Sequence, residues 1–175
     1  MPRRYYTKRT VVVRPKKKWA SIMKSNSFTP AALTSGSSVK VAQYDLVINS
    51  ADSATPTPII VKTGNFKVYG TLNTDITEAN IQKLWNVTGY IMYCPQGYTY
   101  TDDMTAITNH PEYIMGRTTM KFVPGQNSSF SISSRLKRNL NSGDSIKLLI
   151  AIHKDSSLTG TLNTYLNLQY YTCAN

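Results

Sequence analysis

Short apolar runs separated by polar turns follow one another along most of the chain. Alternation of apolar and polar positions over about four to eight residues is typical of a half-buried strand. Turn residues such as Pro95-Gln96-Gly97 and Pro124-Gly125 separate the runs. The pattern predicts seven strands, at residues 39–49, 59–72, 87–94, 113–123, 128–134, 145–153 and 161–172.

Other local patterns predict the segments between and within these strands. The apolar phase changes near Gln43, which predicts a β-bulge or a change of partner. Asp75 and Glu78 have the spacing of a capping box, so one short helix is expected from Asp75 to Trp85. Residues 98–111 read as a long surface loop, in which Tyr98 and Tyr100 build subunit contacts or stay exposed, and residues 135–144 read as a polar turn.

Many short strands and few helical signals favour an antiparallel sandwich of jelly-roll type. We therefore expect an all-β fold: a single jelly-roll sandwich with a disordered basic N-terminal arm and at most one or two short helices. A jelly roll has eight strands, so the missing one is expected in 59–72, in the last segment or in 11–13. The predicted organisation is an arm at 1–24, a linker at 25–38 and the sandwich domain at 39–175.

Positive charge is concentrated in the first 24 residues. They contain nine basic and no acidic side chains, whereas the remaining 151 residues contain 11 basic and nine acidic ones. Lysine and arginine that contact phosphates release counterions, and aromatic rings stack on unpaired bases. The arm therefore predicts binding to single-stranded nucleic acid, through Arg3, Arg4, Tyr5, Tyr6, Lys8, Arg9, Arg14, Lys16, Lys17, Lys18, Trp19 and Lys24.

Two other interpretations of the arm remain open. A block of like charge also occurs in solvated tails that serve solubility or targeting. Arg3-Arg4 and the basic run 15–18 are spaced like a bipartite nuclear import signal. A membrane-surface helix is disfavoured because no apolar face with helical spacing can be drawn in the arm. No apolar run is long enough for a membrane span or a secretory signal, so we expect no membrane insertion and synthesis inside a cell.

The chain shows few signs of catalytic chemistry. It has no GxxxxGK phosphate loop and no GxSxG motif, and it has only two histidines. His110 lies near Glu112 but is expected to be a satisfied or interface histidine. Cys94 and Cys173 are expected to be small buried side chains. We therefore expect no enzyme activity, no cofactor and no metal site.

Four segments resemble a known family: YIMYCPQG at 90–97, NHPEYI at 109–114, SSRLKRNLNSGDSI at 133–146 and QYYTCAN at 169–175. Together with the basic arm they are similar to capsid proteins of circovirus-like viruses, which have circular single-stranded DNA genomes. The resemblance implies a jelly roll of which about 60 copies close an icosahedral T=1 shell, with the arm facing the genome. It also implies nucleic-acid contacts from Arg135, Lys137 and Arg138, although a solvated turn is the alternative.

Three functions follow as hypotheses. The first is a self-assembling capsid protein that packages circular single-stranded DNA in a virion or virus-like particle. Its partners would be the protein itself, the genome, a host receptor and nuclear import factors, with assembly in the host nucleus. The second is a capsid protein of a small single-stranded RNA virus or satellite. The third is a non-viral protein that binds single-stranded nucleic acid.

Overall fold

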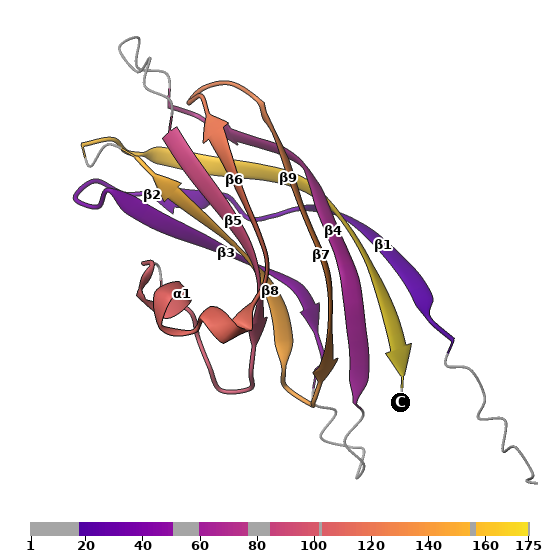
Figure 1. The fold of residues 1–175 in the computed structure, drawn as a ribbon. Coiled ribbons are helices and arrows are strands. Elements are labelled where there is room, and N and C mark those ends of the chain that lie inside the picture. The colour runs from indigo at the N-terminus through magenta and orange to yellow at the C-terminus, as the bar shows by residue number, and fades with distance from the viewer. Residues whose placement is uncertain (1–17, 51–59, 77–84, 102, 155–156, 175) are drawn as a thin grey trace, which may run out of the picture.

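The computed structural model describes residues 18–50, 60–76, 85–101, 103–154 and 157–174, which form a two-layer β-sandwich (Figure 1). The five-stranded sheet has the order β1 (Ala20–Ser27), β9 (Gly160–Ala174), β4 (Val61–Thr74) and β7 (Ser128–Leu140), and β2 (Ala31–Leu33) also pairs with β9. The four-stranded sheet has the order β3 (Val39–Ile48), β8 (Ser145–His153), β5 (Trp85–Cys94) and β6 (Ile114–Phe122). None of the helices in the described part is long and apolar enough to cross a membrane.

The strands pair as they would in one long antiparallel hairpin that has been folded over into two sheets. With the short β2 left aside, the first long strand pairs with the last (β1 with β9) and the second with the seventh (β3 with β8). The third pairs with the sixth (β4 with β7) and the fourth with the fifth (β5 with β6). Folding over adds the pairs of β4 with β9 and of β5 with β8, and every pair is antiparallel. This is a jelly roll, which confirms the predicted fold class.

The main core lies between the two sheets, and a second apolar cluster lies on the far side of the four-stranded sheet. Leu148 and Ile150 of β8 point into the main core, whereas Leu149 and Ala151 belong to the second cluster. Successive side chains of a strand point to opposite faces, so a strand buried on both faces must be apolar throughout. That double burial explains why β8 is the most apolar strand of the chain.

The prediction of an irregular linker at 25–38 is wrong in part, because β1 extends to Ser27 and β2 covers 31–33. β1 pairs along its whole length with β9, from Ala20 opposite Thr172 to Ser27 opposite Tyr165, and β2 pairs with β9 as well. β1 has few apolar residues because it is an edge strand, with a neighbour on one side only. Neither β1 nor β2 lies where the eighth strand was expected, and residues 11–13 lie outside the described part.

Two further differences concern segments predicted as non-strand. The polar turn predicted at 135–144 is wrong in its first half, because β7 continues to Leu140 with an irregular register near Arg135. The predicted helix falls mostly on residues 77–84, outside the described part, and Trp85 at its end is instead the first residue of β5. Asp75 accepts a hydrogen bond from the backbone of Thr161, at 2.5 Å, rather than acting within a described helix.

The bulge predicted in the first strand exists, but it lies slightly further along the chain than Gln43. The register between β3 and β8 shifts between Asp45 and Val47. As a result the neighbours Leu46 and Val47 both enter the main core. An extra residue in one strand allows this departure from strict alternation.

Candidate nucleic-acid interface

The residues predicted to bind nucleic acid divide into three groups. Those in 1–17 lie outside the described residues: Arg3, Arg4, Tyr5, Tyr6, Lys8, Arg9, Arg14, Lys16 and Lys17. Lys18, Trp19 and Lys24 lie at or near the start of the five-stranded sheet. Arg135, Lys137 and Arg138 lie in β7, at the opposite edge of the same sheet. Both described groups therefore belong to one layer of the sandwich.

The register of β4, β7 and β9 sets which side chains of this sheet face away from the core. Tyr170 is buried in the main core, so the neighbouring Tyr171 points outward. Lys137 and Tyr171 both lie opposite Gly64 and share that outward side. Repeating this step along the three strands, and adding Trp19 because its ring contacts Lys137, gives an outward surface that we call the cationic face: Trp19, Lys62, Lys67, Tyr69, Arg135, Lys137, Tyr165, Asn167, Gln169 and Tyr171.

Acidic side chains are absent from all five strands of this sheet. The five strands contain six basic residues, namely Lys24, Lys62, Lys67, Arg135, Lys137 and Arg138. None of the six forms an ion pair with a carboxylate of the described residues. On the other sheet, by contrast, Lys147 pairs with Asp45 at 2.5 Å. A surface with uncompensated cations attracts a polyanion.

Trp19 connects the cationic face to the basic N-terminal segment. It directly precedes β1, and the Lys137 ammonium lies 5.1 Å from the centre of its ring. A cation over an indole ring is attracted by the negative face of the π system. The contact places Trp19, which follows the basic segment in the sequence, against Lys137 of β7.

Arg138 has a different environment from its neighbours on β7. Its guanidinium donates a hydrogen bond to the backbone carbonyl of Glu112, at 2.7 Å, and lies 5.3 Å from the ring centre of Tyr93. Arg138 therefore points toward the loop on the other sheet, and its charge is partly used within the subunit. A structural role fits Arg138 better than the predicted nucleic-acid contact.

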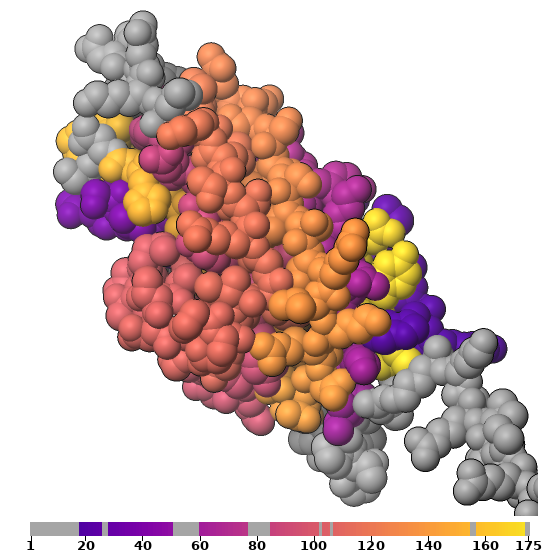
Figure 2. Space-filling model, in the orientation of Figure 1, coloured from indigo at the N-terminus to yellow at the C-terminus, as the bar shows by residue number. Residues whose placement is uncertain are grey.

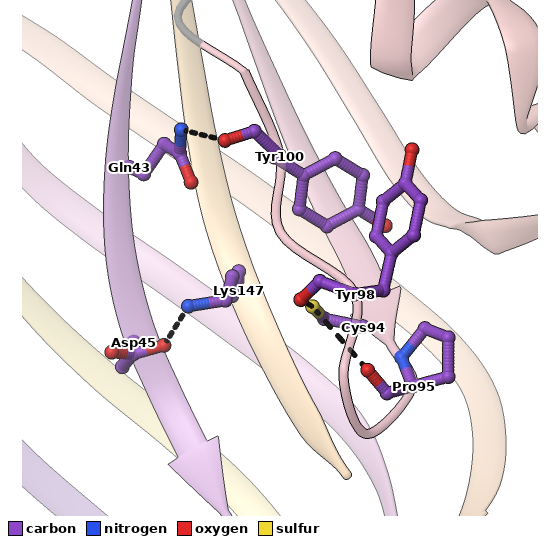
Figure 3. A network of polar contacts seen from close by, with 7 residues as sticks. All are labelled: Gln43, Asp45, Cys94, Pro95, Tyr98, Tyr100 and Lys147. Atoms are coloured by element: carbon purple, nitrogen blue, oxygen red, sulfur yellow. Dashed lines mark hydrogen bonds and ion pairs between the residues drawn. The ribbon is translucent and has the colours of Figure 1, made fainter.

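Among the described residues, a loop covers the outer side of the four-stranded sheet, whereas no helix covers the cationic face. The loop after β5 folds over the four-stranded sheet and contains α1 (Thr105–Asn109) and the 3₁₀ turn η1 (Pro111–Tyr113), as Figures 1 and 2 show. Figure 3 shows how the loop is fastened: the Gln43 amide donates to the Tyr100 carbonyl at 2.7 Å, and the Cys94 thiol donates to the Tyr98 carbonyl at 3.2 Å. The Tyr100 side chain is 2% exposed, which corrects the expectation that it builds a subunit contact or stays exposed.

The two cysteines and His110 behave as predicted. Cys94 and Cys173 are both buried thiols that form no disulfide with each other, and burial raises the pKa of the Cys94 thiol above its usual value. His110 contacts the Glu112 carboxylate at 3.0 Å and stacks on Tyr113. That hydrogen bond lowers the pKa of Glu112. Within the described residues, no group of three or more His, Cys, Asp or Glu side chains is placed to hold a metal ion.

Asp144 fixes the turn between β7 and β8. Its carboxylate accepts hydrogen bonds from the Tyr93 hydroxyl at 2.8 Å and from the backbone N–H groups of Gln96 at 3.0 Å and Asn141 at 2.8 Å, and the residue is 4% exposed. Burial, followed by the hydrogen bond to Asp144, raises the pKa of Tyr93 to about 12. The turn that follows the basic end of β7 is therefore rigidly tied to β5.

We expect Asp144→Asn to lower the free energy of unfolding by about 2–3 kcal/mol, because a buried carboxylate that accepts three hydrogen bonds is replaced by an amide. Asp45→Asn is the matched control, since it removes a carboxylate from a half-exposed ion pair worth about 0–1 kcal/mol. Chemical denaturation of the purified protein measures both. Equal losses in the two variants would contradict the role of Asp144.

Sequence reasoning missed the aromatic and amide part of the cationic face. Tyr165, Asn167, Gln169 and Tyr171 alternate with leucines along β9, and this period of two was visible in the sequence. What the sequence did not show was that Lys62 and Lys67 of β4 and the basic end of β7 lie beside them. That proximity depends on which strands pair, and pairing is not a local property.

Comparison with solved structures supports the fold. A chain in the cryo-EM structure of Mud crab tombus-like virus has 13% identity and a TM-score of 0.50, over 99% of this chain and 88% of that one. A chain of Desmodium yellow mottle tymovirus has 14% identity and a TM-score of 0.38, over 100% of this chain and 92% of that one. A chain of the infectious bursal disease virus Gx strain has 9% identity and a TM-score of 0.39, over 90% of this chain and 32% of that one. No protein-family model and no curated protein matches the sequence. The first likeness shows that this chain has a jelly-roll fold found in a virus structure.

Proposed function

We propose that this protein is the capsid protein of a small icosahedral virus, and that its copies enclose a single-stranded nucleic acid. One observation carries the proposal: a jelly-roll subunit presents a sheet with six basic and no acidic residues, directly continuous with a basic N-terminal segment. The jelly-roll domain forms the shell, and the positive charge binds a partner that carries many phosphates. No catalytic step is needed.

The partner in the shell is the protein itself. Repeated copies of one chain close into assemblies of point-group symmetry, and about 60 copies make the simplest icosahedral shell. The cationic face and the loop-covered opposite face give the subunit two chemically different sides. We propose that the cationic face and residues 1–24 are directed at the enclosed nucleic acid, because that arrangement pairs the uncompensated cations with phosphates.

The support is stronger for RNA than for DNA. The likeness with a TM-score of 0.50 is to a chain of Mud crab tombus-like virus, and it supports a small icosahedral RNA virus rather than a circovirus. Phosphate neutralisation and base stacking do not depend on the sugar, so the cationic face suits either polymer. We therefore propose single-stranded RNA as the packaged genome.

Circular single-stranded DNA is the second candidate, and the four sequence motifs at 90–97, 109–114, 133–146 and 169–175 favour it. On this proposal the basic run 15–18 also directs the protein to the nucleus through import factors. A fluorescent protein fused to residues 1–24 tests import in cells. Accumulation in the nucleus supports it, and an even distribution contradicts it. The proposed location of the assembled protein is the virion, and the host receptor is a further expected partner.

Electron microscopy of the purified full-length protein tests the proposal. We expect uniform closed shells with an absorbance ratio at 260 and 280 nm above that of protein alone. After the shells are disrupted, ribonuclease should degrade the contents of native particles and deoxyribonuclease should not. Degradation by deoxyribonuclease alone would select the DNA candidate, and the absence of shells over a range of salt would contradict the proposal as a whole.

A further inference from the structure

A break in the regular ladder opens a hollow in the cationic face. The register of β4 shifts against both of its neighbours after Gly64, and Asn65 adopts a left-handed backbone conformation with φ of 53°. At Gly64 itself, a Cβ atom would lie 2.6 Å from the Cγ atom of Lys137. Only glycine therefore allows the Lys137 side chain to lie across β4 at this point. The bulge and the glycine together shape the surface beside Arg135.

The hollow has a volume of about 410 Å³, in the lower part of the range of about 300–1,000 Å³ for small-ligand sites. We call it the bulge hollow; it is lined by Asn65, Phe66, Ser133, Ser134, Arg135 and Tyr171. These residues come from β4, β7 and β9, three neighbouring strands of one sheet. A rigid sheet therefore holds the lining in place.

The lining combines one cation, one outward-facing ring and short polar groups. Arg135 is exposed and forms no ion pair with a carboxylate of the described residues. Tyr171 is half-buried and presents its ring beside it, and the Asn65 amide and Ser133 hydroxyl add donors and acceptors. Below them Phe66 is buried and stacks on Tyr170 at 5.7 Å between ring centres. None of the carboxylates in the described residues lines the hollow.

We propose that the bulge hollow is a fixed binding site for one nucleotide of a single-stranded nucleic acid. The Arg135 guanidinium binds the phosphate, because its planar fork matches two phosphate oxygens. The base stacks on the ring of Tyr171, and Asn65 and Ser133 contact the sugar or the base edge. This inference rests on the proposed function and adds to it a structured contact on every subunit, separate from residues 1–17.

Occupancy by nucleic acid explains the lining better than contact with a second copy of the chain. A subunit contact at this place would have to bury the guanidinium of Arg135, and burying a charge is costly unless it is paired. Single-stranded nucleic acid supplies the phosphate and the flat ring together. The Lys67 ammonium, placed on the same face, lies within reach of a neighbouring phosphate along the strand.

Binding of short fluorescent oligo(U) and oligo(dT) strands to the full-length protein, dissociated and freed of its own nucleic acid, tests the site, with anisotropy measured over a range of salt. Arg135→Gln should lower the steepness of the logarithmic salt dependence by about one unit of slope. Tyr171→Ala should weaken binding about five-fold or more, whereas Tyr171→Phe keeps the ring and should bind like the unmodified protein. Arg117→Gln on β6 is the matched control, because it removes the same charge from the other sheet.

The outcomes separate the site from the proposed function. If Arg135→Gln and Tyr171→Ala bind like Arg117→Gln while the unmodified protein binds strongly, the bulge hollow is not a nucleotide site, although the protein still binds nucleic acid. If the two variants fail to assemble but bind normally, the hollow is a subunit contact and the inference is overturned. If the unmodified protein binds neither strand, the proposed function itself fails. Thermal unfolding of each variant checks that the fold is kept.

Discussion

Deleting residues 1–17 should leave particles that assemble but contain little nucleic acid. The deleted segment has seven basic and no acidic residues, and on about 60 copies these would meet on the order of 420 phosphates. The jelly roll should be unaffected, because β1 begins at Ala20 and Trp19 with its contact to Lys137 is retained. The absorbance ratio at 260 and 280 nm of the purified particles should fall toward that of protein alone.

The end point of this deletion matters. A deletion through Lys24 would also remove the first five residues of β1, which pair with residues 168–172 of β9, and would test folding as well as packaging. The matched control keeps the length and replaces the seven basic residues with glutamine, which should also empty the particles. A third variant exchanges each lysine of residues 1–17 for arginine and each arginine for lysine. It keeps the charge and should preserve the nucleic-acid content of the particles. Unchanged nucleic-acid content after deletion would show that residues 1–17 do not package the genome.

Replacing Phe130 with alanine should lower the free energy of unfolding by about 3–5 kcal/mol, the range for removal of a buried aromatic side chain. Phe130 of β7 is 1% exposed and lies in the main core. It reaches across to β5, where a Cβ atom at Gly89 would lie 2.6 Å from its Cζ atom. This ring therefore joins the two sheets of the sandwich. Chemical denaturation of the purified protein measures the loss.

A second substitution tests the contact with Gly89 directly. Gly89→Ala alone should cost about 1–3 kcal/mol, because the new methyl group collides with the ring of Phe130. In the Phe130→Ala background the same change should cost nothing or restore stability, since the methyl group enters the vacated space. An equal cost in both backgrounds would contradict the close approach. Tyr165→Ala, on an exposed side chain of β9, should stay within about 0.5 kcal/mol.

Strands that bury one or both faces were predictable from the sequence. The strand expected at 145–153 is β8 with the same bounds. The strand expected at 39–49 is one residue longer than β3 at its end, and the strand expected at 113–123 is one residue longer than β6 at each end. Burial demands apolar side chains at regular intervals, so such strands leave a local pattern. β1 leaves almost none, because on this edge strand Ile22 is the one apolar residue on the side that faces the core and packs against it. Its place in the sheet comes from pairing with β9.

The sequence predicted the charged residues of the bulge hollow but not the arrangement of strands that forms it. Arg135 and Lys137 were identified from the resemblance of their segment, which was expected to be a turn. Their position in a continuous strand, and the approach of Asn65 and Tyr171 from β4 and β9, follow from the register of the sheet. The register depends on contacts between segments far apart in the chain. For that reason the bulge hollow could not be found from the sequence alone.

Sedimentation velocity of the full-length protein, recorded at 260 and 280 nm together, tests most directly whether it forms a shell around nucleic acid. We expect one fast boundary that absorbs strongly at 260 nm. Its protein mass should be about 1.2 MDa, which corresponds to about 60 copies of a 19.6-kDa chain. A slow boundary of a single subunit or small oligomer at every salt concentration, without 260-nm material in a fast boundary, would contradict the proposal that this jelly roll is a capsid protein.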